Sequence, residues 1–152
     1  METTANYSIL QKCDEGKDRV MLTDEERDAL VKYRIEKAYS TLVEAHDCAE
    51  DNHWTLTANR LYYAAYYASK ALLIQHGIVT KSHEGAIGLI GQNFVVPGII
   101  TVEEAKLLAR LQNMRKTGDY DDFKEWHQED VEPLFEKVEN YINKIKSLIE
   151  SK

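Results

Sequence analysis

The segment from residue 55 to residue 75 constrains the fold most strongly, because the helix that it predicts carries apolar or aromatic side chains on every side. The segment contains five alanines and four tyrosines, and Gly77 follows it as a helix stop. A helix that is apolar all round is usually the buried centre of a bundle. Tyr62, Tyr63, Tyr66 and Tyr67 are therefore interpreted as core or interface packing, with base stacking as the alternative.

Other helices are predicted around this segment from their capping signals. Thr23 with Glu26, and Thr101 with Glu104, have the spacing of capping boxes, and Gly118 is expected to end the second of these helices. Ser82 can cap a short helix. The expected helices cover residues 23–51, 55–75, 82–94, 101–117 and 130–149.

Short connections between these helices favour one architecture. We expect an all-α, up-and-down antiparallel helical bundle of four to five helices over residues 23–150. Residues 1–22 show no sustained period and are expected to form a poorly ordered N-terminal arm.

Charge is distributed unevenly along the chain. The net charge is −7, yet residues 53–118 hold seven Lys/Arg and only three Asp/Glu. A basic middle between acidic ends can form a local anion site on an acidic protein. The alternative is that two solvated acidic helices flank a less charged pair.

Composition argues against several classes of protein. No stretch approaches the ~20 apolar residues that span a bilayer, and the polar, acidic N-terminus is not expected to act as a secretory signal. Cys13 and Cys48 lack metal-ligand spacing and are expected to be free thiols in a cytoplasmic protein. Glu50 and His53 have the spacing of a di-iron motif, but there is no second copy. We therefore expect no metal, no cofactor and no membrane contact.

Three motifs occur in a recognisable order. Residues 59–73 contain an Arg, a Tyr-Tyr-Ala core and a Lys-Ala-Leu-Leu end, which resemble the second-helix signature of HEPN domains. Residues 81–85 resemble the family's Lys-Ser-His segment, and residues 115–120 resemble its Arg-x-x-x-Asp-Tyr element. The resemblance covers about residues 25–148.

The resemblance implies a helical bundle that forms a homodimer and has a link to RNA or nucleotides. Many HEPN proteins are toxins paired with a small nucleotidyltransferase-like antitoxin. Active members cleave RNA without metal, using an Arg followed four to six residues later by a His. In this chain the fifth residue after Arg115 is Tyr120. A phenol has a pKa of about 10 and is a poor base near neutral pH, so the resemblance leaves open whether the protein is an enzyme.

The motifs suggest a set of candidate site residues. Arg115 and Tyr120 are the candidate catalytic pair. Alternatively, Arg115 complements the helix dipole and pairs with Asp119 at i+4, while Tyr120 is a packed tyrosine. His83 shares a stripe with apolar residues and is alternatively a buried or capping group. The candidate ligand-binding residues are Arg60, Tyr63, His83 and Asp119.

Three functions are consistent with this sequence. The first is binding of RNA or a nucleotide by the toxin-like half of a HEPN/nucleotidyltransferase module. The second is a non-catalytic dimerisation or protein-interaction module. The third is an active metal-independent endoribonuclease, in which Tyr120 or His83 would have to transfer protons.

Overall fold

The computed structural model describes residues 22–151, so the predicted N-terminal arm, apart from Leu22, and Cys13 lie outside the described residues. The described part is helical and contains no strand. The helices are α2 (Asp24–Glu50), α3 (Trp54–Gln75), α4 (His83–Ile90), η1 (Gly91–Val95), α5 (Val102–Tyr120), α6 (Gln128–Val131) and α7 (Leu134–Glu150).

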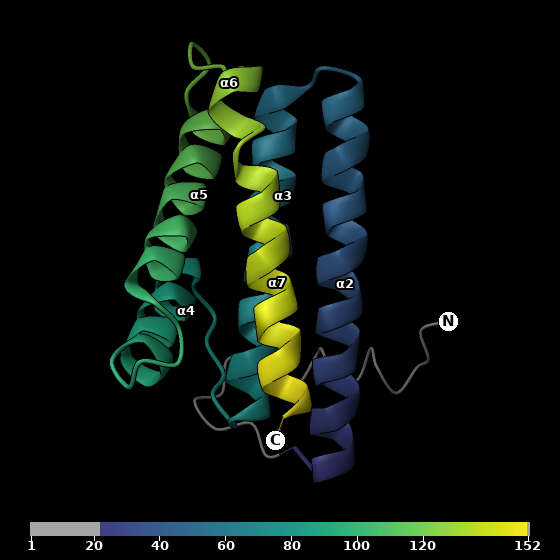
Figure 1. Cartoon of the computed structure of the whole chain (residues 1–152), viewed down its shortest axis with the longest axis vertical. Coiled ribbons are helices and arrows are strands. Elements are labelled where there is room, and N and C mark those ends of the chain that lie inside the picture. The colour runs from purple at the N-terminus through teal and green to yellow at the C-terminus, as the bar shows by residue number, and fades with distance from the viewer. Residues whose placement is uncertain (1–21, 152) are drawn as a thin grey trace.

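The four long helices α2, α3, α5 and α7 run alternately up and down, which confirms the predicted all-α bundle (Figure 1). Helix α3 contacts α2, α5 and α7 and is the centre of the bundle. The prediction from its all-round apolar sequence is therefore confirmed. None of the helices in the described part combines the length and apolarity that crossing a membrane requires.

Both predicted capping boxes begin helices. The Thr23 hydroxyl accepts from the amide of Glu26 at 3.0 Å, and the Glu26 carboxylate accepts from the Thr23 amide at 3.0 Å. Thr101 and Glu104 repeat this arrangement at 3.1 and 2.9 Å. Each box satisfies amides that the first helical turn leaves without partners, so these starts follow from local sequence.

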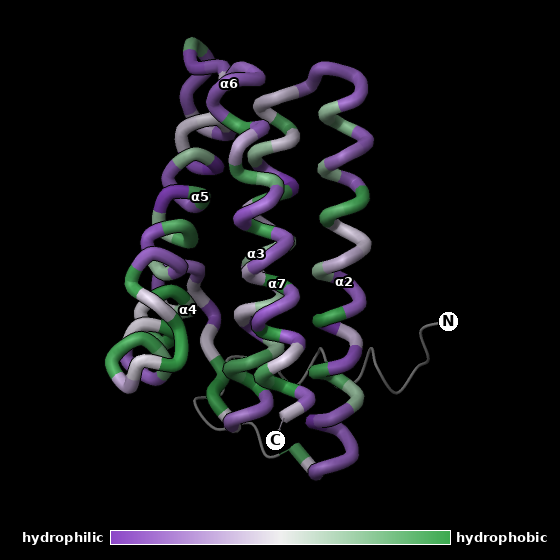
Figure 2. Tube along the Cα trace, viewed as in Figure 1, coloured by the Kyte–Doolittle hydropathy of each residue, from purple (hydrophilic) through white to green (hydrophobic). Residues whose placement is uncertain are grey.

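The core lies where α3 faces α7 and α2. Leu61, Ala65 and Leu72 on α3 are fully or almost fully buried. Hydrophilic and hydrophobic turns alternate along α7, as a helix with one buried face requires (Figure 2). Within this core the Ser69 hydroxyl donates to the Ala65 carbonyl and is hydrogen-bonded to the Tyr141 hydroxyl at 2.7 Å, so its polar atoms are satisfied.

Two helix boundaries differ from the sequence prediction. The last helix is split, because Pro133 lies between α6 and α7 and proline has no amide to donate inside a helix. The third helix ends at Ile90 and continues to Val95 as a π-helical turn. Pro97 and Gly98 then reverse the chain, with Gly98 at a φ of 86°.

Gly118 was expected to end the fourth helix, and that prediction was wrong, because α5 continues to Tyr120. A Cβ at position 118 would lie 2.9 Å from Cγ2 of Thr55 and 3.4 Å from Nε1 of Trp126. Thr55 is held in place, because its hydroxyl accepts from the Trp126 amide at 2.9 Å. The glycine therefore lets the end of α5 pack closely against Thr55 at the start of α3 and Trp126 in the segment after α5.

We expect Gly118→Ala to lower the free energy of unfolding by about 1 kcal/mol, although alanine normally favours a helix. Gly88→Ala is the control, because a Cβ there meets no atom within 4 Å. That change should raise stability by about 0.5–1 kcal/mol. Urea unfolding of both variants measures the difference, and stabilisation by both would contradict the packing role of Gly118.

Candidate functional site

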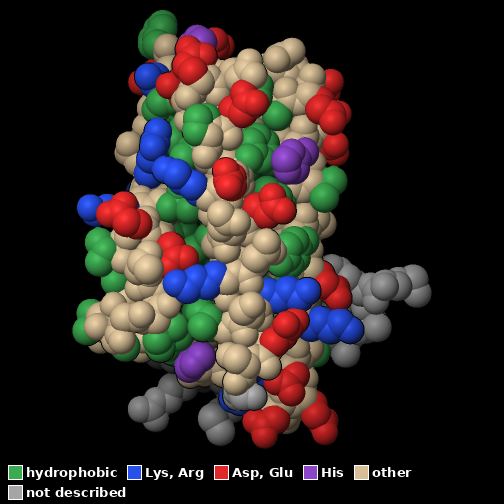
Figure 3. Space-filling view, viewed as in Figure 1, with side chains coloured by type: hydrophobic (Ala, Val, Ile, Leu, Met, Phe, Trp, Pro, Cys, Tyr) green, Lys and Arg blue, Asp and Glu red, His purple; other side chains and the backbone are tan. Residues whose placement is uncertain are grey.

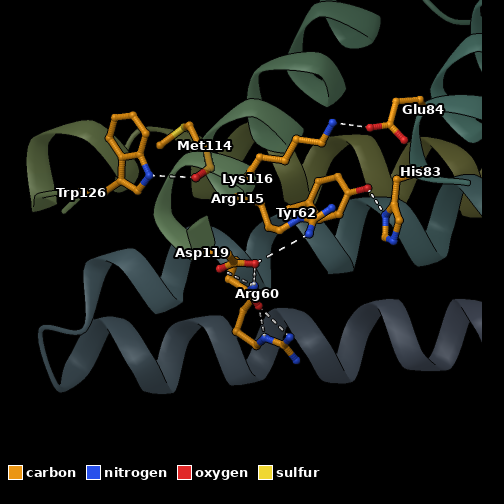
Figure 4. A network of polar contacts seen from close by, with 10 residues as sticks. Arg60, Tyr62, His83, Glu84, Met114, Arg115, Lys116, Asp119 and Trp126 are labelled. Atoms are coloured by element: carbon orange, nitrogen blue, oxygen red, sulfur yellow. Dashed lines mark hydrogen bonds and ion pairs between the residues drawn. The ribbon is translucent and has the colours of Figure 1, made fainter. Parts of the chain in front are cut away.

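The candidate site lies where α3, α4 and α5 meet, around the guanidinium of Arg115 (Figure 4). Arg115 is only 7% exposed. Its Cζ lies 5.2 Å from the ring centroid of Tyr62 and 5.8 Å from that of Tyr63. Nε of Arg115 is buried and has no hydrogen-bond partner. A buried cation with an unused donor is expensive unless something else compensates it, so this atom needs an explanation.

A polar chain leads from Arg115 to α3. Arg115 NH1 lies 3.8 Å from Oδ2 of Asp119, the i+4 pair that the sequence suggested. Both Asp119 oxygens accept from the Asn59 amide group, at 3.3 and 3.2 Å. The Asn59 carbonyl accepts from Arg60 at 2.7 and 3.0 Å, and Arg60 also pairs with Glu44 on α2 at 3.5 Å. Asp119 is thus shared between an arginine and an amide.

A second chain leads from Tyr62 to α4. The Tyr62 hydroxyl is hydrogen-bonded to Nδ1 of His83, and the His83 ring stacks on Tyr66 with centroids 4.4 Å apart. Burial raises the pKa of Tyr62, although Arg115 lowers it in part. Burial, followed by the nearby Arg115 charge, lowers the pKa of His83 below 6.5. Both groups are therefore neutral near pH 7.

Protonation of His83 is expected to destabilise the fold. The pKa of His83 in the folded protein lies below its unfolded value, so its contribution is complete above about pH 6.5 and is lost as the pH falls through the folded pKa. We expect His83→Asn to reduce the fall in unfolding free energy between about pH 7 and about pH 5. Urea titrations across this range measure it. An unchanged slope in His83→Asn would contradict the prediction.

The structure brings five of the six predicted site residues together and leaves Tyr120 apart at the surface. Arg60, Tyr63, His83, Arg115 and Asp119 lie in one connected region of α3, α4 and α5. Tyr120 is 77% exposed and stands at the outer edge. The pKa of Arg115 is raised overall: burial lowers it, whereas surrounding hydroxyls, including that of Tyr120, and the Asp119 carboxylate raise it.

Two residues at the centre of the region were not singled out as site residues from the sequence: Asn59 was given no role, and Tyr62 was only grouped with three other tyrosines as packing or base-stacking residues. Asn59 joins Arg60 to Asp119, and Tyr62 joins Arg115 to His83. Asn59 carries a usable signal, because a polar amide within an apolar helix needs a hydrogen-bond partner. Tyr62 carries none, because four similar tyrosines stand within six residues.

The chemistry of the region is that of a recessed cation at the edge of an aromatic surface. A guanidinium with donors in a planar fork suits phosphate oxygens, and tyrosine rings suit bases. In residues 22–151 no group of three His, Cys, Asp or Glu side chains is placed to hold a metal ion. The ion pair between Lys116 and Glu84 ties α5 to α4 beside the site.

The fold defines a small all-α protein built as an up-and-down bundle. The family model described as HEPN domain matches residues 31–148. The chain therefore belongs to the HEPN domain family. The "UPF0332 protein" of Thermotoga maritima is 30% identical over 125 residues, which cover 82% of this chain and 95% of that relative.

Two relatives come from Methanocaldococcus jannaschii. The protein named "Putative toxin MJ0142" is 30% identical over 118 residues, 78% of this chain and 80% of its own length. The protein named "Putative toxin MJ0605" is 29% identical over 115 residues, 76% of this chain and 85% of its own length. This chain therefore spans most of each relative.

Proposed function

We propose that this HEPN protein binds RNA or a nucleotide at Arg115, and that it acts as the toxin-like half of a module with a nucleotidyltransferase-like antitoxin. Family membership and the names of the M. jannaschii relatives support the toxin-like role. The proposal assigns Arg115 to phosphate binding, with Arg60, Tyr63, His83, Asp119 and Tyr120 around it.

The observation that carries the binding proposal is the unpartnered Nε of a buried arginine. A structural arginine normally satisfies its donors within the protein, because each buried unsatisfied donor costs about 1–3 kcal/mol. Arg115 has one ion pair, at 3.8 Å, aromatic rings on one side and hydrogen bonds with the hydroxyls of Tyr62 and Tyr120, and none of these contacts uses Nε. Phosphate oxygens would supply the acceptor that the protein does not.

The exposed end of the site supports the proposed homodimer. Phe123 is 99% exposed and lies three residues after Tyr120, and Leu56 on α3 is 49% exposed. Trp126 joins this end of α5 to the start of α3, because its indole donates to the Met114 carbonyl at 2.9 Å and its amide donates to Thr55. A second copy covering these apolar groups would bring two Arg115 sites towards each other.

Binding rather than cleavage is the proposed activity. The position five residues after Arg115 holds Tyr120, and His83 already uses Nδ1 to contact Tyr62. Metal-independent cleavage requires one group that accepts a proton and one that donates it beside the same phosphate. Arg115 and Tyr120 provide a cation and a phenol, which suit holding a phosphate and stacking a base.

Fluorescence anisotropy with labelled short RNAs and competing mononucleotides tests the proposal. We expect saturable binding that Arg115→Met weakens at least about tenfold, the scale of one lost charge-assisted hydrogen bond. Arg110→Met is the matched control, because Arg110 is an exposed arginine one and a half turns earlier on α5. Equal binding by both variants and the wild type would favour the interaction module that needs no ligand.

A further inference from the structure

Helix α3 carries a row of tyrosines and cations on its side next to α2. We call Arg60, Tyr63 and Tyr67 on α3, together with Lys37 on α2, the tyrosine–cation ridge. Arg60 Cζ lies 5.2 Å from the Tyr63 ring centroid, and the Tyr63 and Tyr67 centroids are 5.9 Å apart. Lys37 Nζ lies 5.0 Å from the Tyr67 centroid. A cation therefore lies at each end of a pair of adjoining rings.

The ridge is on the side of α3 that α7 does not cover. Ser69 contacts Tyr141 on α7, and it is two residues, about 200° around the helix, from Tyr67. Figure 1 shows α7 lying along one side of α3 only. Tyr63, Tyr67, Lys37 and Arg60 are all partly exposed, so their rings and charges are accessible at the surface of the described structure.

The helix that carries most of the ridge has no acidic side chain, whereas α2 beside it carries eight Asp/Glu and four Lys/Arg. No acidic residue occurs between Asp51 and Glu84, so the whole of α3 lacks carboxylates. Figure 3 shows acidic and basic side chains interspersed over the face that it draws, and the first turn of α2 holds three acidic residues. Glu44 is the carboxylate that pairs with Arg60, and no carboxylate of the described residues pairs with Lys37.

A second buried arginine underlies the ridge. Arg34 on α2 is 8% exposed, and its Cζ lies 6.0 Å from the Tyr67 ring centroid. Its Nε is buried and has no hydrogen-bond partner, as at Arg115. The two arginines stand on either side of the tyrosines, each with an unused donor. A core built only for stability would not leave two such donors beside one row of rings.

We propose that the tyrosine–cation ridge binds single-stranded RNA as an extension of the Arg115 site. Adjoining aromatic rings with basic side chains at both ends suit a single strand, because bases stack on rings while phosphates contact cations. Arg60 is the junction, since it contacts Tyr63 on the ridge and reaches Asp119 through Asn59.

The length of the ridge sets the length of RNA that it can contact. From Arg60 to Tyr67 the helix advances about 10 Å at about 1.5 Å per residue. A stacked strand advances about 3.4 Å per nucleotide, so the ridge fits about three nucleotides beyond the one at Arg115. This inference rests on the proposed RNA-binding function and adds to it a preference for single strands of at least about four nucleotides.

Affinity as a function of RNA length tests the ridge. The full-length protein is titrated with labelled oligouridylates of two, four and six nucleotides. We expect the wild-type affinity to rise at least about tenfold from two to six nucleotides. Tyr67→Leu and Lys37→Gln should each lower the affinity for the hexanucleotide several-fold and leave the dinucleotide unchanged. Lys37→Gln should also reduce the slope of log affinity against log salt by about 0.7, as for one lost phosphate contact.

The controls separate the ridge from the Arg115 site. Lys32→Gln changes an exposed lysine of α2 that lines the groove with α7, and it should behave as the wild type. Arg115→Met should weaken binding at both lengths. Dinucleotide binding without any gain in the hexanucleotide would overturn the ridge while leaving the proposed function standing, and no binding at either length would overturn both.

A second copy of the chain is the competing occupant of this face. Light scattering at the concentrations of the binding assay measures the oligomeric state of Tyr67→Leu and Lys37→Gln. An unchanged mass together with the length-selective loss of affinity supports RNA binding along the ridge. A change from dimer to monomer without length-selective loss shows that the ridge is a contact between copies, which overturns the proposal.

Discussion

Leu61→Ala is expected to lower the free energy of unfolding by about 3 kcal/mol, the middle of the range for a buried leucine. Leu61 is fully buried at the centre of α3, and α3 contacts every other long helix. No neighbouring helix can move into the space without losing contacts elsewhere, so a cavity would remain. Guanidinium unfolding followed by far-UV circular dichroism measures the change.

Leu56→Ala is the matched control on the same helix. Leu56 is 49% exposed, and the same change there should alter stability by about 0.5 kcal/mol or less. Both substitutions remove the same side-chain atoms from the same helix. Equal losses at the two positions would show that α3 is not the centre around which the bundle is packed.

Local sequence signals predicted the beginnings of helices better than their ends. The boxes of Thr23 and Thr101 each act within four residues, so no tertiary knowledge was needed. The prediction at Gly118 failed, because a glycine near a helix end normally predicts that the helix stops there, whereas α5 continues past it. In the folded protein Gly118 is instead a contact surface for Thr55 and Trp126, which only the three-dimensional arrangement brings to it.

In the candidate site, contacts within one helix could be predicted from the sequence, and contacts between helices could not. The spacing of Arg115 and Asp119 suggested their ion pair, because residues four apart on a helix face each other. The sharing of Asp119 with Asn59, and the contact of Tyr62 with His83, join separate helices. Side-chain periodicity describes one helix at a time, so it cannot specify which residues of α3, α4 and α5 meet.

The exposure of Tyr120 could not be predicted for a related reason. Its position after Arg115 made the two residues the candidate catalytic pair, which requires their side chains to lie together. The structure places the guanidinium inside and the phenol mostly in solvent, at 7% and 77% exposure. Arg115 and Tyr120 meet at the surface of the bundle, so a pocket that encloses both side chains requires a second surface to cover them. The proposed homodimer, with Phe123 beside Tyr120, is one way to supply it.

Arg115→Met is expected to abolish most RNA binding while leaving the fold as stable as the wild type, or more so. Replacing a buried charge with an apolar group of similar length is often neutral or stabilising, because the desolvation cost of the charge disappears. Here the unpartnered Nε would also be removed. The lost contacts with Tyr62 and Tyr63 offset part of this gain, by about 0.5–2 kcal/mol.

Asp119 limits the loss of stability that Arg115→Met can cause. Its carboxylate is partly exposed and keeps both hydrogen bonds from Asn59, so no isolated buried charge remains. Thermal unfolding of Arg115→Met should therefore have a midpoint at or above that of the wild type. Arg115→Ala should be less stable than Arg115→Met by about 2 kcal/mol, because it leaves a cavity. A loss of stability in Arg115→Met comparable to that in Arg115→Ala would show that the guanidinium serves the fold. Stability retained while binding is lost is the pattern expected of a residue that the fold holds in place for a ligand.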